Sequence, residues 1–191
     1  MRVGVLALQG AVAEHIRSLE NCGAEGVAIK RTEQLDEIDG LIIPGGESTT
    51  IGKLMRAYGF IEAIRSFSEK KKPIFGTCAG LIVMAERLSG GEPPHLQLMN
   101  VTVARNAFGR QRESFEIDLQ MKGWNRPVRA VFIRAPLIES AGDGVDVLAE
   151  YRGGIVAVRQ GHLLGASFHP ELTDDTSMHE YFLEMIRQYS A

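Results

Sequence analysis

A cysteine flanked by glycines is the feature of this sequence most suited to chemistry. Cys78 stands between Gly76 and Gly80, after the apolar run Pro73-Ile74-Phe75 and before an apolar segment at 81–85. Glycine two positions away on each side is typical of a nucleophile elbow, a strand-to-helix turn too tight for larger side chains. The pattern predicts that Cys78 has a strained backbone at the carboxyl end of a sheet, beside a helix start that favours the thiolate.

A base for this thiol stands near the end of the chain. His169 follows an apolar run at 163–168 that is typical of a buried strand, and Glu171 is two residues further on. In extended chain, residues i and i+2 share a face, and Pro170 favours an extended His169. Taken singly, the cysteine and the histidine would be an inert core residue and a satisfied polar group. Together they predict a triad in the order Cys78, His169, Glu171.

The composition is that of an ordinary globular protein, and we expect one domain over residues 1–191. The net charge of −3 and the pI of about 6.0 suggest neither a nucleic-acid nor a membrane partner. Two cysteines in such different settings do not form a disulfide framework, and we interpret Cys22 as structural, at a helix end. A reactive thiol and the absence of a signal-peptide pattern favour a cytoplasmic location.

Apolar strands alternate with helices in the first half of the chain. The pattern predicts strands at 3–8, 27–29, 40–43 and 73–75, a helix at 12–19 and a helical stretch after residue 48. Further strands are predicted at 101–103, 115–117, 128–133, 145–149, 155–158 and 163–168, with a closing helix at 177–189. Continuous apolar strands joined by helices indicate an α/β fold, with a mixed, mostly parallel sheet, helices on both faces and an antiparallel extension.

Three loops are expected to converge beyond the carboxyl ends of the strands. They are the loop 44–48, the elbow and the loop that carries His169. The backbone amides of Gly46 and Ala79 would then form an oxyanion hole. Gly45-Gly46 is equally explained as a plain tight turn, and Glu47 onward as a helix cap, which is compatible with substrate binding.

These residues resemble the triad, or class I, glutamine amidotransferases. Within that group the sequence is similar to the glutaminase subunit of pyridoxal 5′-phosphate synthase, from the first strand to the last helix. The motifs that carry the resemblance are Leu6 to Gly10, Glu14-His15, Pro44 to Thr50, Gly76 to Ile82, Arg105 to Gln111, Ser114 to Glu116, Phe132 to Pro136 and Ser167 to Leu172. Ile82 stands where the commoner amidotransferase pattern has glutamine, which favours the vitamin B6 subfamily.

The resemblance implies a flavodoxin-like sheet and a reaction. Glutamine would be hydrolysed to glutamate, and the ammonia would pass to a synthase partner, itself a large ring, that builds pyridoxal 5′-phosphate. No metal and no cofactor are implied, because pyridoxal 5′-phosphate is the product. The glutamine contacts that it implies are Gly46, Glu47, Ser48, Arg105, Ile133 and Arg134. Arg105 suits a carboxylate as a planar fork, although it could instead be a solvated charge.

A docking edge is also predicted for the synthase. Gln9, Glu14 and His15 follow the first strand and are expected at the carboxyl edge of the sheet, within reach of a partner. They could equally be solvated surface residues.

Other functions share some of these features. One is the glutaminase subunit of another amidotransferase, such as that of histidine biosynthesis, which Ile82 and the segment 105–111 disfavour. Another is a cysteine-elbow protein of the protease and chaperone superfamily, in which histidine typically follows the cysteine, where this chain has Ala79. A regulatory subunit with a dead site is disfavoured by the intact triad.

Replacing Cys78 with alanine is expected to abolish glutamine hydrolysis without unfolding the protein. Loss of the covalent route should lower turnover by several orders of magnitude, as triad deletions do. A glutamine-mimicking electrophile should modify Cys78 and spare Cys22, which mass spectrometry of the labelled peptides would establish. A variant that keeps a tenth of the turnover would contradict the assignment.

Overall fold

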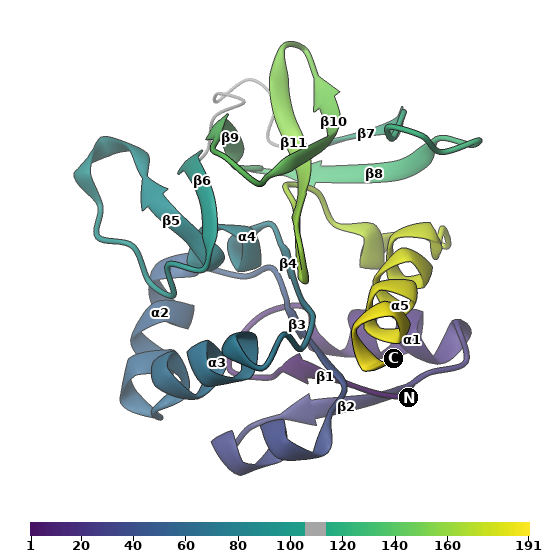
Figure 1. The fold of residues 1–191 in the computed structure, drawn as a ribbon. Helices are drawn as coiled ribbons and strands as arrows, with labels where there is room; N and C mark the ends of the chain where they lie inside the picture. The colour runs from purple at the N-terminus through teal and green to yellow at the C-terminus, as the bar shows by residue number, and fades with distance from the viewer. Residues whose placement is uncertain (106–113) are drawn as a thin grey trace.

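The parallel half of the main sheet determines where the site loops lie. The computed structural model describes residues 1–105 and 114–191. Among these residues, five neighbouring strands run parallel in the order β2-β1-β3-β4-β12 (Figure 1). They are β1 (Arg2–Leu6), β2 (Glu25–Ile29), β3 (Gly40–Ile43), β4 (Ile74–Thr77) and β12 (Leu163–Ala166). Because parallel strands end at the same edge, the loops after β1, β3, β4 and β12 open to one side.

The sheet continues beyond β12 with mostly antiparallel pairs. The strands of this part are β11 (Gly154–Gln160), β9 (Leu137–Ala141), β6 (Met99–Ala104) and β5 (Ala85–Leu88), with β10 (Asp146–Tyr151) also paired to β11. Only β5 and β6 pair in parallel among the described strands of this part. A separate antiparallel pair is formed by β7 (Ser114–Leu119) and β8 (Val128–Ile133). The predicted mixed sheet with an antiparallel extension is confirmed.

Helices cover both faces of the parallel strands. Figure 1 shows α1 (Val12–Asn21) and α5 (Ser177–Ser190) on one side, and α2 (Ser48–Ala57) and α3 (Phe60–Glu69) on the other. The short α4 (Ala79–Met84) follows β4 directly, and single 3₁₀ turns lie at η1 (Thr32–Glu37), η2 (Ser89–Gly91) and η3 (Pro170–Leu172).

The alternation of side chains along the strands explains this layering. Ile42 and Phe75 pack in the core under α1 and α5, where the rings of Phe75 and Phe182 lie 5.6 Å apart. Their neighbours Ile43 and Ile74 point the other way, into the core under α2 and α3. Each such fully buried side chain contributes about 1.5–3 kcal/mol, so the sheet is stabilised from both faces.

The chain leaves the sheet earlier than predicted after β12. The strand predicted at 163–168 ends at Ala166. Ser167 N still donates to Val156 O of β11, but His169 N donates to Val131 O of β8. The chain thus turns toward β8 after β12, which brings His169 over the end of β4. The strand predicted at 3–8 also ends two residues earlier than predicted, at Leu6.

Other elements differ from the sequence patterns. The helical stretch after residue 48 is two helices, because Gly59, with φ of 78°, ends the first and starts the second. The short strands β5 and β9 were not predicted at all. The segment 106–111, part of the subfamily's motifs, lies outside the described residues.

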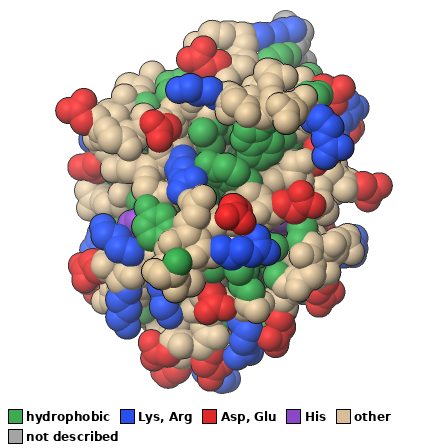
Figure 2. Space-filling view, turned by 45° about the vertical axis from the view of Figure 1, so that its right-hand side comes forward, with side chains coloured by type: hydrophobic (Ala, Val, Ile, Leu, Met, Phe, Trp, Pro, Cys, Tyr) green, Lys and Arg blue, Asp and Glu red, His purple; other side chains and the backbone are tan. Residues whose placement is uncertain are grey.

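Neither basic nor acidic side chains dominate the face of the protein that Figure 2 displays. Basic and acidic side chains are interspersed there around a group of hydrophobic side chains. No helix in the described part of the chain is long and apolar enough to span a membrane. Within the same residues, no group of three or more histidine, cysteine or acidic side chains is arranged to hold a metal ion.

Replacing Gly80 with alanine is expected to destabilise the protein by about 2–3 kcal/mol, the usual cost of overpacking. A Cβ at this position would lie 1.9 Å from Ile43 O, which is backbone and cannot move aside. Urea unfolding would measure the loss. Gly144→Ala is the control, because its φ of +82° adds backbone strain but its Cβ meets nothing within 4 Å. Equal losses in the two variants would contradict the steric explanation.

Candidate active site

The turn at Cys78 has the strained geometry of a nucleophile elbow. Cys78 has φ of 51° and ψ of −109°, between the end of β4 and the start of α4. Side chains at the flanking glycines would clash, since a Cβ on Gly76 would lie 2.6 Å from Gly80 O. The glycines therefore allow α4 to pack directly on β3 and β4, and the thiol is presented at the carboxyl edge.

His169 and Glu171 lie beside this turn. The Nδ1 atom of His169 is 2.6 Å from Oε1 of Glu171, and both side chains are largely buried. The prediction that an extended chain brings them together is wrong. Residues 170–172 form the 3₁₀ turn η3, and His169 has φ of −108° and ψ of 88°. The tight turn folds the carboxylate back toward the imidazole ring.

The electrostatics of His169 favour its protonated form. Burial lowers the pKa of His169, but hydrogen bonds to Cys78 and Glu171 outweigh it and raise the pKa to about 10. With Nδ1 turned to the carboxylate, the other ring nitrogen is left for the thiol. The arrangement is suited to a thiolate–imidazolium pair in which the carboxylate stabilises the cation.

Gly45 and Gly46 allow their loop to lie close to His169 and Gln9, because glycine has no side chain. A Cβ on Gly45 would lie 2.5 Å from Cε1 of His169, and one on Gly46 would lie 2.2 Å from Oε1 of Gln9. The loop is held from the β1–α1 connection, where Ala11 N donates to Gly45 O. Neither glycine has a positive φ, so close approach and not special backbone conformation explains them.

Glu47 caps α2, which was one of the two predicted explanations of this loop. Its carboxylate accepts hydrogen bonds from Thr49 N at 3.1 Å and Thr50 N at 2.7 Å. The hydrogen bond from the Thr50 hydroxyl is the main reason why the pKa of Glu47 falls to about 2. The backbone N of Glu47 donates to Oε1 of Gln9.

Arg105 lies at the mouth of the site with its guanidinium already paired. It contacts Glu92 at 3.1 Å and Glu47 at 3.2 Å, and about a third of its side chain is exposed. These partners hold the planar fork at the cavity, and their exposure leaves it open to exchange.

The predicted residues surround one cavity of about 460 Å³. Its lining consists of Gly10, Ala11, Gly45, Gly46, Glu47, Ser48, Cys78, Ala79, Ile82, Arg105, Ile133, Arg134 and His169. All six predicted glutamine contacts are in this set, together with the nucleophile and the base. The structure brings them together, and their individual roles stay predictions. Arg134 has a positive φ of 43°, and the carbonyl of Ile133 lies 4.0 Å from the sulfur of Cys78.

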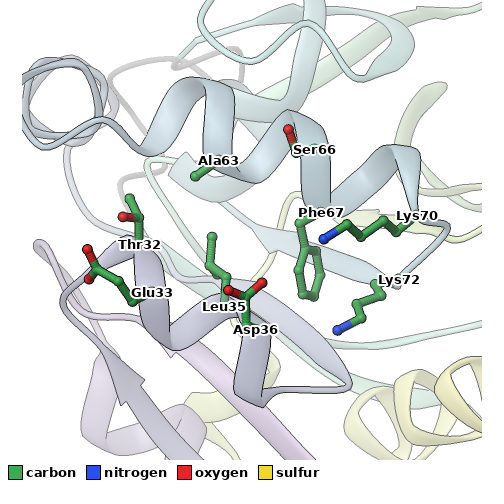
Figure 3. A pocket seen from close by; sticks show the side chains of 9 residues that line it. All are labelled: Thr32, Glu33, Leu35, Asp36, Ala63, Ser66, Phe67, Lys70 and Lys72. Carbon is green, nitrogen blue, oxygen red and sulfur yellow. The ribbon is translucent and has the colours of Figure 1, made fainter.

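Another hollow does not have the groups for this chemistry. Figure 3 shows it between η1 and α3, with Lys70 and Lys72 at one end and Glu33 at the other. Its volume is about 280 Å³, and its described lining contains no cysteine or histidine. Lys72 is held there by Ile38 O and by the ring of Phe67, which explains it as a structural residue.

The predicted docking edge is only partly at the surface. His15 is fully buried, so its prediction as a partner contact was wrong: helix α1 turns it inward against the sheet. Gln9 is exposed and Glu14 is half-buried, and their docking role stays a prediction. Cys22 is at the end of α1, half-buried, with a pKa that burial raises, which fits its interpretation as structural.

A buried polar group behind the triad was not predicted from the sequence. His15, Thr77 and His179 meet there, and none of them was predicted to contact another. The contacts of Gln9 with the glycine loop were not predicted either. The available signals were the motif Glu14-His15 and the spacing of His15 from Leu19, which indicates the inner face of α1 but not the distant partners.

Known proteins resemble this chain over nearly its whole length. The sequence matches the SNO glutamine amidotransferase family over residues 5–188. A Niallia circulans protein named pyridoxal 5′-phosphate synthase subunit PdxT is 74% identical over 188 residues, which cover 98% of this chain and 99% of that protein. The protein of the same name from Geobacillus sp. (strain WCH70) is 60% identical over 191 residues and the full length of both chains.

Solved structures agree with these matches. A crystal structure of a glutamine amidotransferase has a TM-score of 0.92 to this chain at 49% identity, covering 97% of this chain and 98% of the other. A putative GMP synthase component from Thermoplasma acidophilum shares the fold at a TM-score of 0.71 and 15% identity, covering 100% of this chain and 96% of the other.

The fold is that of the class I glutamine amidotransferases, with a cysteine at the elbow. The chain belongs to the SNO glutamine amidotransferase family. This membership argues against the alternatives of a histidine-biosynthesis subunit and of a protease or chaperone.

Glu47→Gln is expected to lower the free energy of unfolding at pH 7 by up to about 1 kcal/mol, because a charged cap is lost at an exposed helix start. The pKa of Glu47 is about 2 in the folded protein, below the usual 4.5. Its stabilisation is therefore complete above pH 4.5 and is lost as the pH falls from 4.5 toward 2. Urea unfolding at pH 7, 5 and 3 would measure this. Glu20→Gln, on the exposed side of α1, is the control. A difference that is independent of pH would contradict the prediction.

Proposed function

We propose that this chain hydrolyses L-glutamine to L-glutamate and ammonia, with Cys78 as the nucleophile and His169 and Glu171 as its base and orienting group. The observation that supports this most directly is the Cys78 elbow beside a histidine whose Nδ1 is 2.6 Å from the Glu171 carboxylate. An amide is a poor electrophile, and covalent catalysis through a thioester divides its barrier into two smaller ones.

The first half of the reaction forms the thioester. The Cys78 sulfur, its proton taken by His169, attacks the side-chain amide carbon of glutamine, and the carbonyl oxygen becomes an oxyanion. The His169 imidazolium then gives its proton to the amide nitrogen as the carbon–nitrogen bond breaks, which releases ammonia. Glu171 stays ionised and stabilises the imidazolium through Nδ1.

The second half releases glutamate. A water gives a proton to His169 and attacks the thioester carbon, and the carbon–sulfur bond breaks as Cys78 leaves as the thiolate. In both halves the oxyanion needs donors that act only in the transition state. The backbone N–H groups of Gly46 and Ala79 are the proposed donors, because both line the cavity beside the nucleophile.

The charged end of glutamine requires partners at the cavity mouth. Arg105 would bind the α-carboxylate, exchanging its exposed contact with Glu92 for the substrate. The Glu47 carboxylate would remain beside the α-ammonium, and its lowered pKa keeps it ionised. Ser48, Ile133 and Arg134 complete the walls of the cavity.

The ammonia would pass to the synthase subunit of pyridoxal 5′-phosphate synthase. Relatives that are 60–74% identical over essentially the whole chain are named as subunits of that synthase. The synthase would use the ammonia to build the vitamin from a pentose phosphate and a triose phosphate. Pyridoxal 5′-phosphate is then a product, and hydrolysis by this chain requires no cofactor. A cytoplasmic location remains a proposal.

The synthase subunit is expected to raise the turnover of this chain on glutamine. The exposed connection after β1 is hydrogen-bonded directly to the Gly45–Gly46 loop, because Ala11 N donates to Gly45 O and Glu47 N donates to Gln9 Oε1. A partner that orders this connection would orient the oxyanion amides, so the gain should fall in kcat more than in KM. Steady-state glutaminase kinetics with and without the synthase would measure it, with Cys78→Ala as the blank.

A matched pair of variants tests where the partner acts. Gln9→Ala should reduce the activation, whereas Gln188→Ala, at the far end of α5, should leave it unchanged. Equal turnover with and without the synthase would defeat the activation, and no hydrolysis above the Cys78→Ala blank would defeat the proposed function itself.

A further inference from the structure

Behind the triad, three elements contribute side chains to a buried polar cluster. His15 of α1, Thr77 of β4 and His179 of α5 are all fully buried. The Nδ1 atom of His15 is 2.9 Å from Nε2 of His179, and its Nε2 atom is 3.2 Å from the Thr77 hydroxyl. The same Nε2 atom is 3.5 Å from Oε2 of Glu171. The cluster therefore adjoins the acidic member of the triad.

The two oxygens of Glu171 have different surroundings. Oε1 faces His169 at 2.6 Å, whereas Oε2 is buried and has no hydrogen-bond partner among the described residues. A buried carboxylate oxygen without a partner is costly, because nothing replaces the hydrogen bonds that it made to water. His15 Nε2 is the nitrogen that faces it, at a distance that can shorten when a substrate fills the site.

The arrangement of protons follows from burial and charge. Burial lowers the pKa of His15 well below its usual value and that of His179 to about 4, so both rings are neutral near pH 7. One proton then lies between them. If His15 Nδ1 carried this proton, the lone pair of His15 Nε2 would face the Glu171 carboxylate, and the two would repel each other. The opposite arrangement is favoured: His179 Nε2–H donates to His15 Nδ1, and His15 presents an N–H to Thr77 and Glu171.

We propose that His15, oriented by His179, is a positioning residue of the triad, whose N–H holds the second oxygen of Glu171 and thereby keeps the first oxygen in line with His169. The inference rests on the proposed glutaminase function and deepens it. It assigns a role to two histidines that do not touch the cavity. It also connects α1 and α5 to the nucleophile through side chains alone.

Loss of this N–H should slow the chemistry and leave substrate binding unchanged. In His15→Leu, kcat should fall about ten- to a hundredfold, because a buried carboxylate oxygen loses the donor that faces it. KM should stay within about twofold, because His15 is not in the cavity lining. His15→Gln keeps an N–H near the position of Nε2 and should recover most of the turnover.

A control distinguishes positioning from ordinary structural loss. His162 is also buried, bonded to the Ser68 hydroxyl at 2.8 Å, but it precedes β12 at the opposite edge of the sheet. His162→Leu should lower stability and leave kcat of the folded protein unchanged. If His15→Leu matches His162→Leu in kcat, or if His15→Gln is no better than His15→Leu, the proposal is wrong.

A second pair of variants covers the case in which His15→Leu does not fold. His179→Gln keeps a donor for His15 Nδ1 and should retain turnover, whereas His179→Leu removes it and should lose turnover. Equal turnover in these two would overturn the proposal. All kinetics are measured on the chain in complex with the synthase, after the folded fraction is established by urea unfolding.

A substrate-independent measurement separates this proposal from the proposed function. The rate of Cys78 alkylation by iodoacetamide reports how well His169 and Glu171 maintain the thiolate, with Cys22 as the internal reference. It should fall in His15→Leu and persist in His15→Gln and His162→Leu. If wild-type protein hydrolyses no glutamine, the proposed function fails, yet this order of alkylation rates would still support the role of His15. Equal rates in all variants would refute that role.

Discussion

The site depends on close contacts between backbone segments around Cys78. A Cβ on Gly80 would lie 1.9 Å from Ile43 O, and one on Gly10 would lie 1.8 Å from Gly45 O. These contacts join the ends of β1, β3 and β4, which the parallel pairing places at one edge of the sheet. The nucleophile, the glycine loop and the base can share a small cavity because no side chains separate their backbones.

Helix α1 supports both parts of the site. Its start, at Ala11, donates to Gly45 O and so holds the glycine loop, while His15 one turn further lies beneath Glu171. A shift of this single helix would move the proposed oxyanion donors and the triad together. That coupling gives a physical route by which a partner near Gln9 would change turnover.

Charge is distributed differently inside the site and at its mouth. Inside, His169 and Glu171 form a close pair, and burial keeps His15 and His179 neutral, so no isolated charge is buried among these described residues. At the mouth, Arg105 is shared between exposed carboxylates whose attraction is screened by water. The interior is therefore suited to fixed geometry, and the mouth to exchange of ionic partners with a zwitterionic substrate.

Features that depend on short spacing could be predicted from the sequence. The elbow at Cys78, the closeness of His169 to Glu171 and the apolar strands all involve residues that are near in sequence. The contact of His169 with Glu171 was predicted for the wrong reason, because the turn η3 and not an extended chain makes it. Contacts between distant segments required the folded structure. His15 meets His179 across 164 positions. The spacing of His15 from Val12 and Leu19 places it on the inner face of α1, but no local pattern indicates which distant residue it meets there. The short strands β5 and β9 and the pairing of Arg105 were equally hidden, because burial and pairing are set by segments that approach only when the sheet forms.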